Sequence, residues 1–199
     1  MKLKKKNSEE DYLFFVTKMK EKISETVELP EGITAEVKEK ELILIGPKGT
    51  LSRFFNNPKI NMSNEDSKIV FSCNSATKRE KKQINTDIAH VNNLIKGTID
   101  GFTYKLKVCS SHFPMGISVS GNKFEVKNYL GEKVPRILKF DETVKISVNG
   151  EEILVESNNK ELAGQTAANI ELLTRRTGFD RRVFQDGIYI TEKAGKIIK

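Results

Sequence analysis

The chain has 199 residues, a formal net charge of +7 and a pI near 9.3. A chain of this length can bury enough surface to fold as one large or two small domains without a disulfide or a metal. Its basic excess favours a polyanionic partner, such as a nucleic acid or an anionic surface. No apolar run approaches the roughly 20 residues of a membrane span, and the first residues are unlike a secretion signal. These features exclude a membrane protein and favour a cytosolic one.

Residues 1–28 predict an added N-terminal helix. Ser8 can serve as its N-cap, and Pro30 and Gly32 can end it. Between these points apolar residues recur at helical spacing, with Lys and Glu on the other face. The apolar residues are Tyr12, Val16, Met19, Ile23 and Val27. The sequence leaves open whether they pack on the same chain or on a neighbouring molecule.

After residue 28 the chain repeats one pattern of elements. Two alternating strand patterns and a turn occupy 35–49 and recur without a gap at 117–131. An apolar strand follows in each half, at 69–71 and at 153–155, and each half then enters a helix. The helical stripes comprise Ile84, Ile88, Val91 and Ile95 in the first half, and Ala163, Ala167, Ile170 and Leu173 in the second.

This repetition predicts an α+β fold made by tandem duplication of a small domain. Each copy would contain an antiparallel sheet packed on one helix. Gly97 and Gly101 interrupt the first helical pattern. We therefore place two domains at 29–101 and 102–199, joined by a short link.

No motif predicts catalysis or a metal site. The segment 46–49, Gly-Pro-Lys-Gly, resembles a phosphate-binding loop only superficially, and a hairpin turn with Lys48 at its tip is the better interpretation. Cys109 and His112 are the one close pair of zinc-ligand types, whereas a structural zinc site usually has two such pairs. Neither histidine has a nucleophile nearby in sequence. We expect no enzyme, cofactor or metal, and buried thiols at Cys73 and Cys109.

Two arginine pairs, Arg175-Arg176 and Arg181-Arg182, lie between the second predicted helix and a short apolar strand. Arginine keeps its charge and offers a planar set of donors that matches phosphate oxygens. Two pairs on a turn between rigid elements therefore predict contact with a polyanion. A solvated helix end paired with acidic side chains is the alternative, because cations are favourable at a helix C-terminus in any case.

Aromatic side chains are few, and the chain has no Trp. Four of them could stack on single-stranded bases, but their strand-like surroundings favour core packing. These are Phe124, Tyr129, Phe184 and Tyr189. We therefore expect contacts with phosphate, sugar and RNA shape rather than base stacking.

Short ordered motifs resemble the large-subunit ribosomal protein six family of archaea and eukaryotes, and the archaeal form in particular. The most continuous match covers residues 164–171 and 180–190, which read GQTAANIE and DRRVFQDGIYI. Further matches are the segments 46–49, 95–97, 101–102, 104–108, 111–115 and 130–133. The resemblance extends from about residue 29 to the C-terminus and leaves out the N-terminal extension.

The resemblance implies a structural constituent of the large ribosomal subunit in the cytoplasm. It implies binding to ribosomal RNA near the sarcin–ricin loop and the docking region of translational GTPases, beside neighbouring ribosomal proteins, with no role for DNA or a membrane. Carried over motif by motif, the resemblance implies RNA-facing positions at Lys105, Lys107, Asn128, Lys133, Arg136, Arg175, Arg176, Arg181 and Arg182, with Lys48, the turn 185–187, Lys193, Lys196 and Lys199 as further candidates. A free-standing RNA-binding or regulatory module of the same fold is the alternative. A third possibility, an enzyme acting on RNA, is not favoured, because the sequence contains no recognisable set of catalytic residues.

Overall fold

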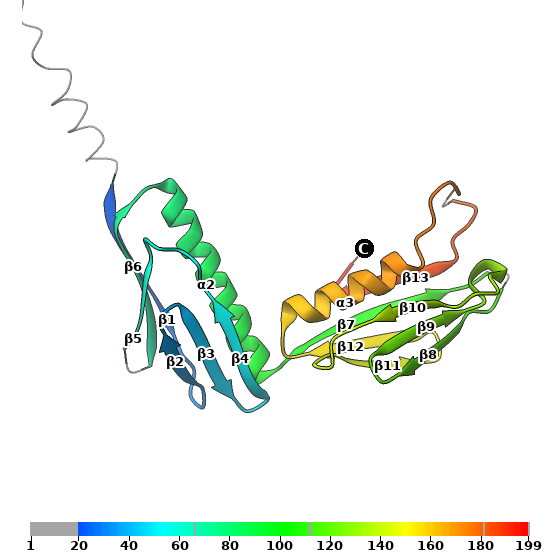
Figure 1. Ribbon diagram of the computed structural model, residues 1–199, viewed down its shortest axis with the longest axis horizontal. Helices are drawn as coiled ribbons and strands as arrows, with labels where there is room; N and C mark the ends of the chain where they lie inside the picture. Colours follow the sequence, from blue (N-terminus) through cyan, green and yellow to red (C-terminus); the bar gives the residue numbers. More distant parts are fainter. Residues whose placement is uncertain (1–19, 66, 112, 181, 199) are drawn as a thin grey trace, which may run out of the picture. The chain divides into compact units, whose positions relative to one another are not determined.

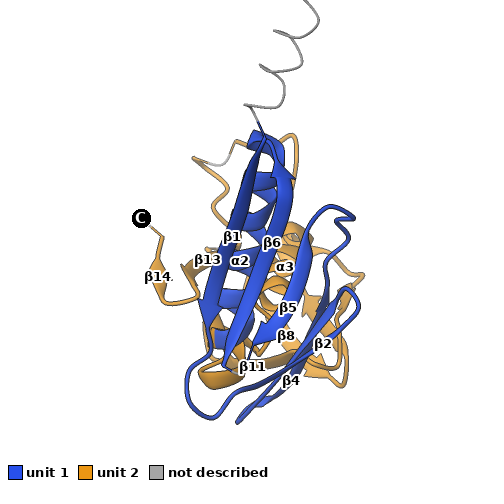
Figure 2. Ribbon diagram, turned by 90° about the vertical axis from the view of Figure 1, so that its left-hand side faces the viewer, with its two compact units in different colours: residues 1–95 blue, residues 96–199 orange. Residues whose placement is uncertain are grey.

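The computed structural model describes residues 20–65, 67–111, 113–180 and 182–198 (Figure 1). The chain divides into two compact units, residues 1–95 and 96–199, which we call unit 1 and unit 2 (Figure 2). Each has its own hydrophobic core, and the two cores share no residue. Across the described residues, neither helix combines the length and the apolar character that a membrane span requires.

Unit 1 contains two three-stranded antiparallel sheets, ordered β1-β6-β5 and β2-β3-β4. Its strands are β1 (Glu21–Glu28), β2 (Thr34–Lys38), β3 (Glu41–Gly46), β4 (Gly49–Phe54), β5 (Asn61–Glu65) and β6 (Lys68–Ala76). The helix α2 (Lys78–Ile99) follows them, and its residues 96–99 belong to unit 2. The predicted helical stripe faces the core, where Ile84 and Val91 are fully buried with Phe71. The predicted hairpin at 46–49 is confirmed, since Gly46 and Gly49 pair across the β3–β4 turn.

The predicted N-terminal helix is wrong for residues 21–28, which form the strand β1. β1 pairs antiparallel with β6, and Val27 lies opposite Ile69. Val27 is buried and Ile23 packs against the same core, so both contact their own chain. The remainder of the predicted helix, up to residue 19, lies outside the described residues.

The helix α2 begins with a reciprocal cap that buries a carboxylate. The Glu80 side chain accepts hydrogen bonds from the backbone N–H of Thr77, at 2.9 Å, and from the Thr77 hydroxyl. Its other oxygen accepts one from Lys59 at 3.1 Å. Glu80 is 6% exposed. The hydrogen bonds from Thr77, with that from Lys59, lower the pKa of Glu80 to about 2.

Unit 2 contains a five-stranded sheet, ordered β11-β12-β7-β13-β14, and a three-stranded sheet, β10-β9-β8. Its elements are β7 (Phe102–Cys109), β8 (Gly116–Ser120), β9 (Lys123–Lys127), the 3-10 turn η1 (Tyr129–Gly131), β10 (Arg136–Lys139), β11 (Lys145–Asn149), β12 (Glu152–Ser157), α3 (Lys160–Leu173), β13 (Gly187–Lys193) and β14 (Lys196–Ile197). Asn159 caps α3, accepting from the backbone N–H of Glu161 at 2.9 Å. A Cβ at Gly164 would lie 3.0 Å from the Tyr104 hydroxyl, so glycine permits α3 to approach β7 closely.

The two units repeat the same order of strands and helix, which confirms the predicted duplication. The central pairing β1–β6 in unit 1 corresponds to β7–β12 in unit 2, and both pairings are antiparallel. α2 follows β6 as α3 follows β12. Unit 2 then adds a segment that unit 1 lacks in the described residues, a loop and the strand β13 on the second edge of β7.

Candidate nucleic-acid interface

The segment 174–186, which we call the arginine loop, connects α3 to β13, and both of its ends are fixed by hydrogen bonds, one to β13 and one to the segment that follows β7. At one end the buried Thr174 hydroxyl accepts from the backbone N–H of Ile188 at 2.9 Å and donates to the carbonyl of Glu171 at 3.2 Å. At the other end the Asp186 carboxylate accepts from the backbone N–H and the hydroxyl of Ser111, at 2.6 and 2.5 Å. The loop is therefore held at defined positions before it meets any partner.

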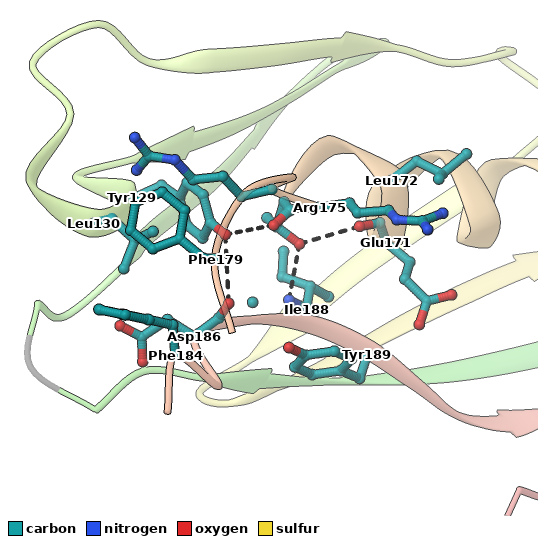
Figure 3. Close-up of a pocket in the computed structure, with 13 residues that line it drawn as sticks. Tyr129, Leu130, Glu171, Leu172, Arg175, Phe179, Phe184, Asp186, Ile188 and Tyr189 are labelled. Carbon is teal, nitrogen blue, oxygen red and sulfur yellow. Dashed lines mark hydrogen bonds between the residues drawn. The ribbon is translucent and has the colours of Figure 1, made fainter. Parts of the chain in front are cut away.

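The Tyr129 hydroxyl joins these two ends. It donates to the carbonyl of Thr174 at 2.5 Å, and the carbonyl of Asp186 lies 3.4 Å away (Figure 3). Tyr129 is 2% exposed, and burial raises its pKa, which keeps the hydroxyl protonated as a donor. Tyr129 itself is positioned by left-handed backbone at Asn128 and Leu130, with φ of 58° and 50°. The Asn128 side chain also donates to the carbonyl of Pro114 at 3.1 Å.

Arg136 is half-buried, and its guanidinium is bound by the protein. Its guanidinium donates to the carbonyl of Leu173 at 2.6 Å and to both Glu132 oxygens at 2.8 and 2.7 Å. The same group lies 4.4 Å from the centre of the Tyr129 ring. The hydrogen bond from Arg136 lowers the pKa of the Glu132 carboxyl. Arg136 therefore provides a hydrogen-bond donor for a backbone carbonyl at the C-terminal end of α3, directly before the arginine loop.

The arginines of the loop are, by contrast, exposed to solvent. Arg175, Arg176 and Arg182 are all exposed, and the side chains of Arg175 and Arg182 form no ion pair with any described residue. The Asp180 carboxylate accepts from the backbone N–H of Arg182 at 2.9 Å, so it stabilises the turn. Arg181 lies outside the described residues. Salt bridges with acidic neighbours thus do not account for Arg175 and Arg182.

Two phenylalanines of the loop are also exposed. One of them, Phe184, is predicted from the sequence to pack in the core. Phe179 is 39% and Phe184 is 46% exposed. Their rings pack edge to face with centres 4.9 Å apart, and the Arg176 guanidinium lies 4.3 Å from the centre of Phe179. The predicted core position of Phe184 is therefore wrong, because β13 begins only at Gly187. Core packing is confirmed for Phe124 and Tyr129.

The lysines of β7 lie on a sheet face where charges are balanced. Lys105 forms an ion pair with Glu192 of β13 at 2.7 Å, and this hydrogen bond raises the pKa of Lys105. Lys107 lies opposite Glu152 in the β12–β7 register. This face is therefore less favourable for a polyanion than the arginine loop.

The other predicted lysines lie at turns. Lys48 is exposed at the β3–β4 turn of unit 1, and Lys133 is exposed between η1 and β10. Lys193 and Lys196 are exposed and pair across the β13–β14 hairpin. The structure thus places the arginines on a single loop, while the lysines are distributed over several elements.

No group of side chains in the described part of the chain has the arrangement of a metal site. Cys73 is buried and Cys109 is half-buried, and both are free thiols. His112, the nearest ligand type to Cys109 in sequence, lies outside the described residues.

The family model described as ribosomal protein L6 matches the chain twice, over residues 29–103 and 113–187. The chain belongs to the ribosomal protein L6 family. The family predicted from the motifs is confirmed, and the chain is a structural ribosomal protein rather than an enzyme. The second match contains the whole arginine loop and ends at its junction with β13.

Archaeal members of the L6 family are similar to nearly all of this chain. The protein of Methanococcus vannielii, named large ribosomal subunit protein uL6, is 43% identical over 88% of this chain and 97% of its own length. The uL6 proteins of Methanosarcina mazei and Sulfurisphaera tokodaii are 42% and 43% identical, over 88% and 85% of this chain and 100% and 91% of their own lengths. The double match and the repeated units agree in showing an L6 protein with two copies of one domain.

Sequence reasoning missed Phe179 and Phe184 as part of this surface. Both follow turn-forming residues, Gly178 with φ of 86° and the Asp180 turn, which could have indicated a loop instead of a strand.

Proposed function

We propose that this chain is a structural constituent of the large subunit of the cytoplasmic ribosome, where the arginine loop is the principal contact of unit 2 with ribosomal RNA. The uL6 relatives are named as proteins of that subunit. A protein built into the subunit contacts its RNA and neighbouring ribosomal proteins. The family resemblance further supports a position near the sarcin–ricin loop and the docking region of translational GTPases.

The proposed RNA contact rests mainly on the exposure of Arg175 and Arg182. Both side chains are exposed and have no ion pair among the described residues, on a loop whose two ends are hydrogen-bonded to Ile188 of β13 and to Ser111. Because the backbone is held at both ends of the loop, binding a phosphate requires less ordering of the backbone, and the remaining cost is that of fixing the arginine side chains.

The other candidate residues take different roles in this proposal. Arg176 and Arg181 extend the same contact, and Asn128 and Lys133 contribute from the turn around η1. Lys193 and Lys196 provide a separate contact from the β13–β14 hairpin, at the end of β13 away from the loop. Arg136 mainly positions the loop, because three of its five N–H donors are bound to Glu132 and Leu173 and its charge is balanced by Glu132. Lys105 and Lys107 contribute less because acidic residues face them, and Lys48 provides a separate contact from unit 1.

Salt-titrated binding to large-subunit RNA tests the phosphate contact. Replacing Arg175 and Arg182 together by Ala should reduce the slope of log K against log salt by about 1.4 to 1.8, because each lost phosphate contact removes about 0.7 to 0.9. The control is Lys123→Ala with Lys139→Ala, an exposed pair that faces across β9 and β10 and removes the same charge. An equal change of slope in both double variants would refute the arginine loop as the contact.

Two further experiments address the finer claims. Hydroxyl-radical footprinting of large-subunit RNA should show protection at the sarcin–ricin loop that disappears in the arginine double variant. Protection elsewhere would reject that position. Cosedimentation through a high-salt wash separates a built-in subunit protein from a free-standing RNA-binding module, because the latter should wash off.

A further inference from the structure

The helix α2 of unit 1 has a strongly basic outer face. It packs on one side of the unit 1 sheets, and its opposite side is turned away from them (Figure 1). At about 100° per residue, the four cations near its start lie within an arc of about 160° on that opposite side, away from the buried Ile84 and Val91. These exposed cations, which we call the α2 cluster, are Lys78, Arg79, Lys81 and Lys82.

Neither carboxylate of α2 balances the α2 cluster, because both are buried and bound elsewhere. Glu80 is 6% exposed, caps the helix at Thr77 and forms an ion pair with Lys59 at 3.1 Å. Asp87 is 4% exposed and accepts a hydrogen bond from Gln83 at 2.8 Å. The four cations form no ion pair with any described residue. The exposed residues of α2 between 83 and 95 are uncharged, and they are Gln83, Asn85, Thr86, Ala89 and Asn92.

The α2 cluster is unfavourable for the helix itself. Cations are disfavoured at the positive end of the helix dipole, where the cluster lies. Lys78 and Lys82 are four residues apart, and Arg79 and Lys82 are three apart, so their like charges repel along the helix surface. The helix end needs no anion, since the Thr77 hydroxyl already accepts from the backbone N–H of Arg79 at 3.3 Å. Side chains retained against these costs are expected to bind an anionic partner.

The corresponding helix of unit 2 has the opposite character. Among the residues of α3, all of them described, Glu161 is the one exposed residue with a charge. Both helices follow the equivalent strand of the repeated unit and pack on its sheet. The fold therefore does not require a basic outer face, and the cations are a property of unit 1.

We propose that the α2 cluster binds the phosphate backbone of a double-helical segment of large-subunit RNA, a proposal that rests on the function proposed above. Cations one helical turn apart can contact neighbouring phosphates. α2 contains no Phe, Tyr or Trp, so this face cannot stack unpaired bases. The neutral amides of Asn85 and Asn92, on the same side of the helix, are suited to hydrogen-bond ribose hydroxyls. Unit 1 thus contributes an RNA contact of its own that does not depend on base sequence.

Salt-titrated binding of the full chain to large-subunit RNA and to an RNA duplex of about 20 base pairs tests this assignment. Lys78→Gln with Lys82→Gln removes two charges and keeps polar side chains. It should reduce the slope of log K against log salt by about 1.4 to 1.8 on both RNAs, because each lost phosphate contact removes about 0.7 to 0.9. Its melting temperature should not fall, because repulsion within the helix is relieved. A weaker affinity would then not be a consequence of unfolding.

The matched control is Lys38→Gln with Lys68→Gln. These exposed lysines of unit 1 are paired with Glu36 at 3.6 Å and with Glu28 at 2.8 Å. Their removal changes the net charge equally but should alter the slope much less. Two duplexes of equal composition and shuffled sequence should bind the wild type equally well. A preference of about tenfold or more for one of them would indicate base readout and overturn the backbone assignment.

The outcomes separate this proposal from the proposed function. If Arg175→Ala with Arg182→Ala lowers the slope on large-subunit RNA but Lys78→Gln with Lys82→Gln does not, the α2 assignment is overturned and the arginine loop contact stands. If the α2 variant and its control lower the slope equally, only net charge matters and the assignment is likewise overturned. If the α2 variant alone lowers the slope, the α2 contact is supported and the arginine loop is not. If the wild type does not bind large-subunit RNA, the proposed function fails together with the α2 contact.

Discussion

Unit 1 and unit 2 have the same order of strands and helix, but they differ at the outer edge of their first strands, β1 and β7. β1 pairs only with β6 among the described strands, whereas its counterpart β7 pairs with β12 on one side and with β13 on the other. Only two residues separate the end of α2 at Ile99 from the start of β7 at Phe102, so no segment is left to return to β1. After α3 the chain is free to return, and it does so through the arginine loop.

The composition of β1 is compatible with an open edge. Its sequence, Glu-Lys-Ile-Ser-Glu-Thr-Val-Glu, places charges along the strand, and Val27 is its only buried residue. Charged edge strands resist pairing with other chains. In unit 2 the corresponding edge is covered, and Ile188 of the covering strand is 1% exposed in the core. In unit 2 the arginine loop thus leads to an additional strand, β13, which covers the edge that β1 leaves open among the described residues of unit 1.

The largest expected effect comes from removing that additional strand. We predict that residues 102–199 fold alone, because their core contains residues of unit 2 only. The shorter fragment 102–173 should fail to fold, because it loses Ile188 from the core and the hydrogen bonds of β13 to β7. Amide dispersion in two-dimensional NMR spectra distinguishes the cases.

The result for either fragment can contradict the proposed difference between the two units. A dispersed spectrum for 102–173 would mean that unit 2 tolerates an open edge as unit 1 does. An undispersed spectrum for 102–199 would contradict the proposed domain boundaries.

A smaller effect is expected where the loop is fastened. Thr174→Val keeps the shape of the side chain but removes the acceptor of the Ile188 N–H and the donor to the Glu171 carbonyl. We expect unit 2 to lose about 1 to 3 kcal/mol of unfolding free energy, because a buried N–H loses its partner. Urea unfolding followed by amide signals of each unit measures this loss.

The matched control is Thr177→Val, an exposed threonine in the same loop. It should change stability by less than about 0.5 kcal/mol. Equal losses at both positions, or a loss shared by unit 1, would show that the fastening at Thr174 is not specific.

Much of the fold can be predicted from the sequence, and β1 shows why one part cannot. Ile23 and Val27 are four residues apart, a spacing that places both on one face of a helix and also on one face of a strand. Lys and Glu around them favour the helix by propensity. The strand forms because this segment pairs with β6, where Val27 lies opposite Ile69. That partner is 42 positions away in sequence at this pair. Local periodicity contains no information about such a distant partner.

The candidate site could be predicted as a region but not residue by residue. The arginine pairs identified the loop, since their number and spacing are visible in the sequence. Arg136 was grouped with them, yet its guanidinium is bound by Glu132 and by the end of α3. Phe184 was expected in the core, because the flanking apolar residues concealed where β13 begins. Both outcomes depend on tertiary hydrogen bonds that connect distant segments.

The helix starts of the two units predict a difference in acid stability. Glu80 caps α2 with a pKa near 2, below the ordinary 4.5, so its ionised form is favoured by folding. Its contribution to stability is complete above pH 4.5 and is lost as the pH falls toward 2. Asn159 caps α3 with an amide that does not titrate.

Glu80→Gln should therefore lower the stability of unit 1 near neutral pH and flatten its pH dependence between about 4.5 and 2. Glu65→Gln changes an exposed carboxyl of the same unit and should leave that dependence intact. Urea unfolding at a series of pH values, read separately for the two units, measures the effect. An unchanged pH dependence in Glu80→Gln would show that another group determines the acid sensitivity of unit 1.

The smallest effect should come from the charged face of β7. Lys105 is paired with Glu192 at 2.7 Å on the sheet, whereas Arg175 has no ion pair among the described residues. Replacing Lys105 by Met keeps much of its length and removes one charge, as Arg175→Ala does. Because the Lys105 charge is already balanced, its loss should alter the RNA salt slope by much less than the roughly 0.7 to 0.9 expected for one phosphate contact. Arg175→Ala should show that full change in the same titration. Equal slopes for the two variants would mean that RNA reaches the sheet face as readily as the loop, and the contrast between the balanced strand and the unpaired arginines would then carry no functional meaning.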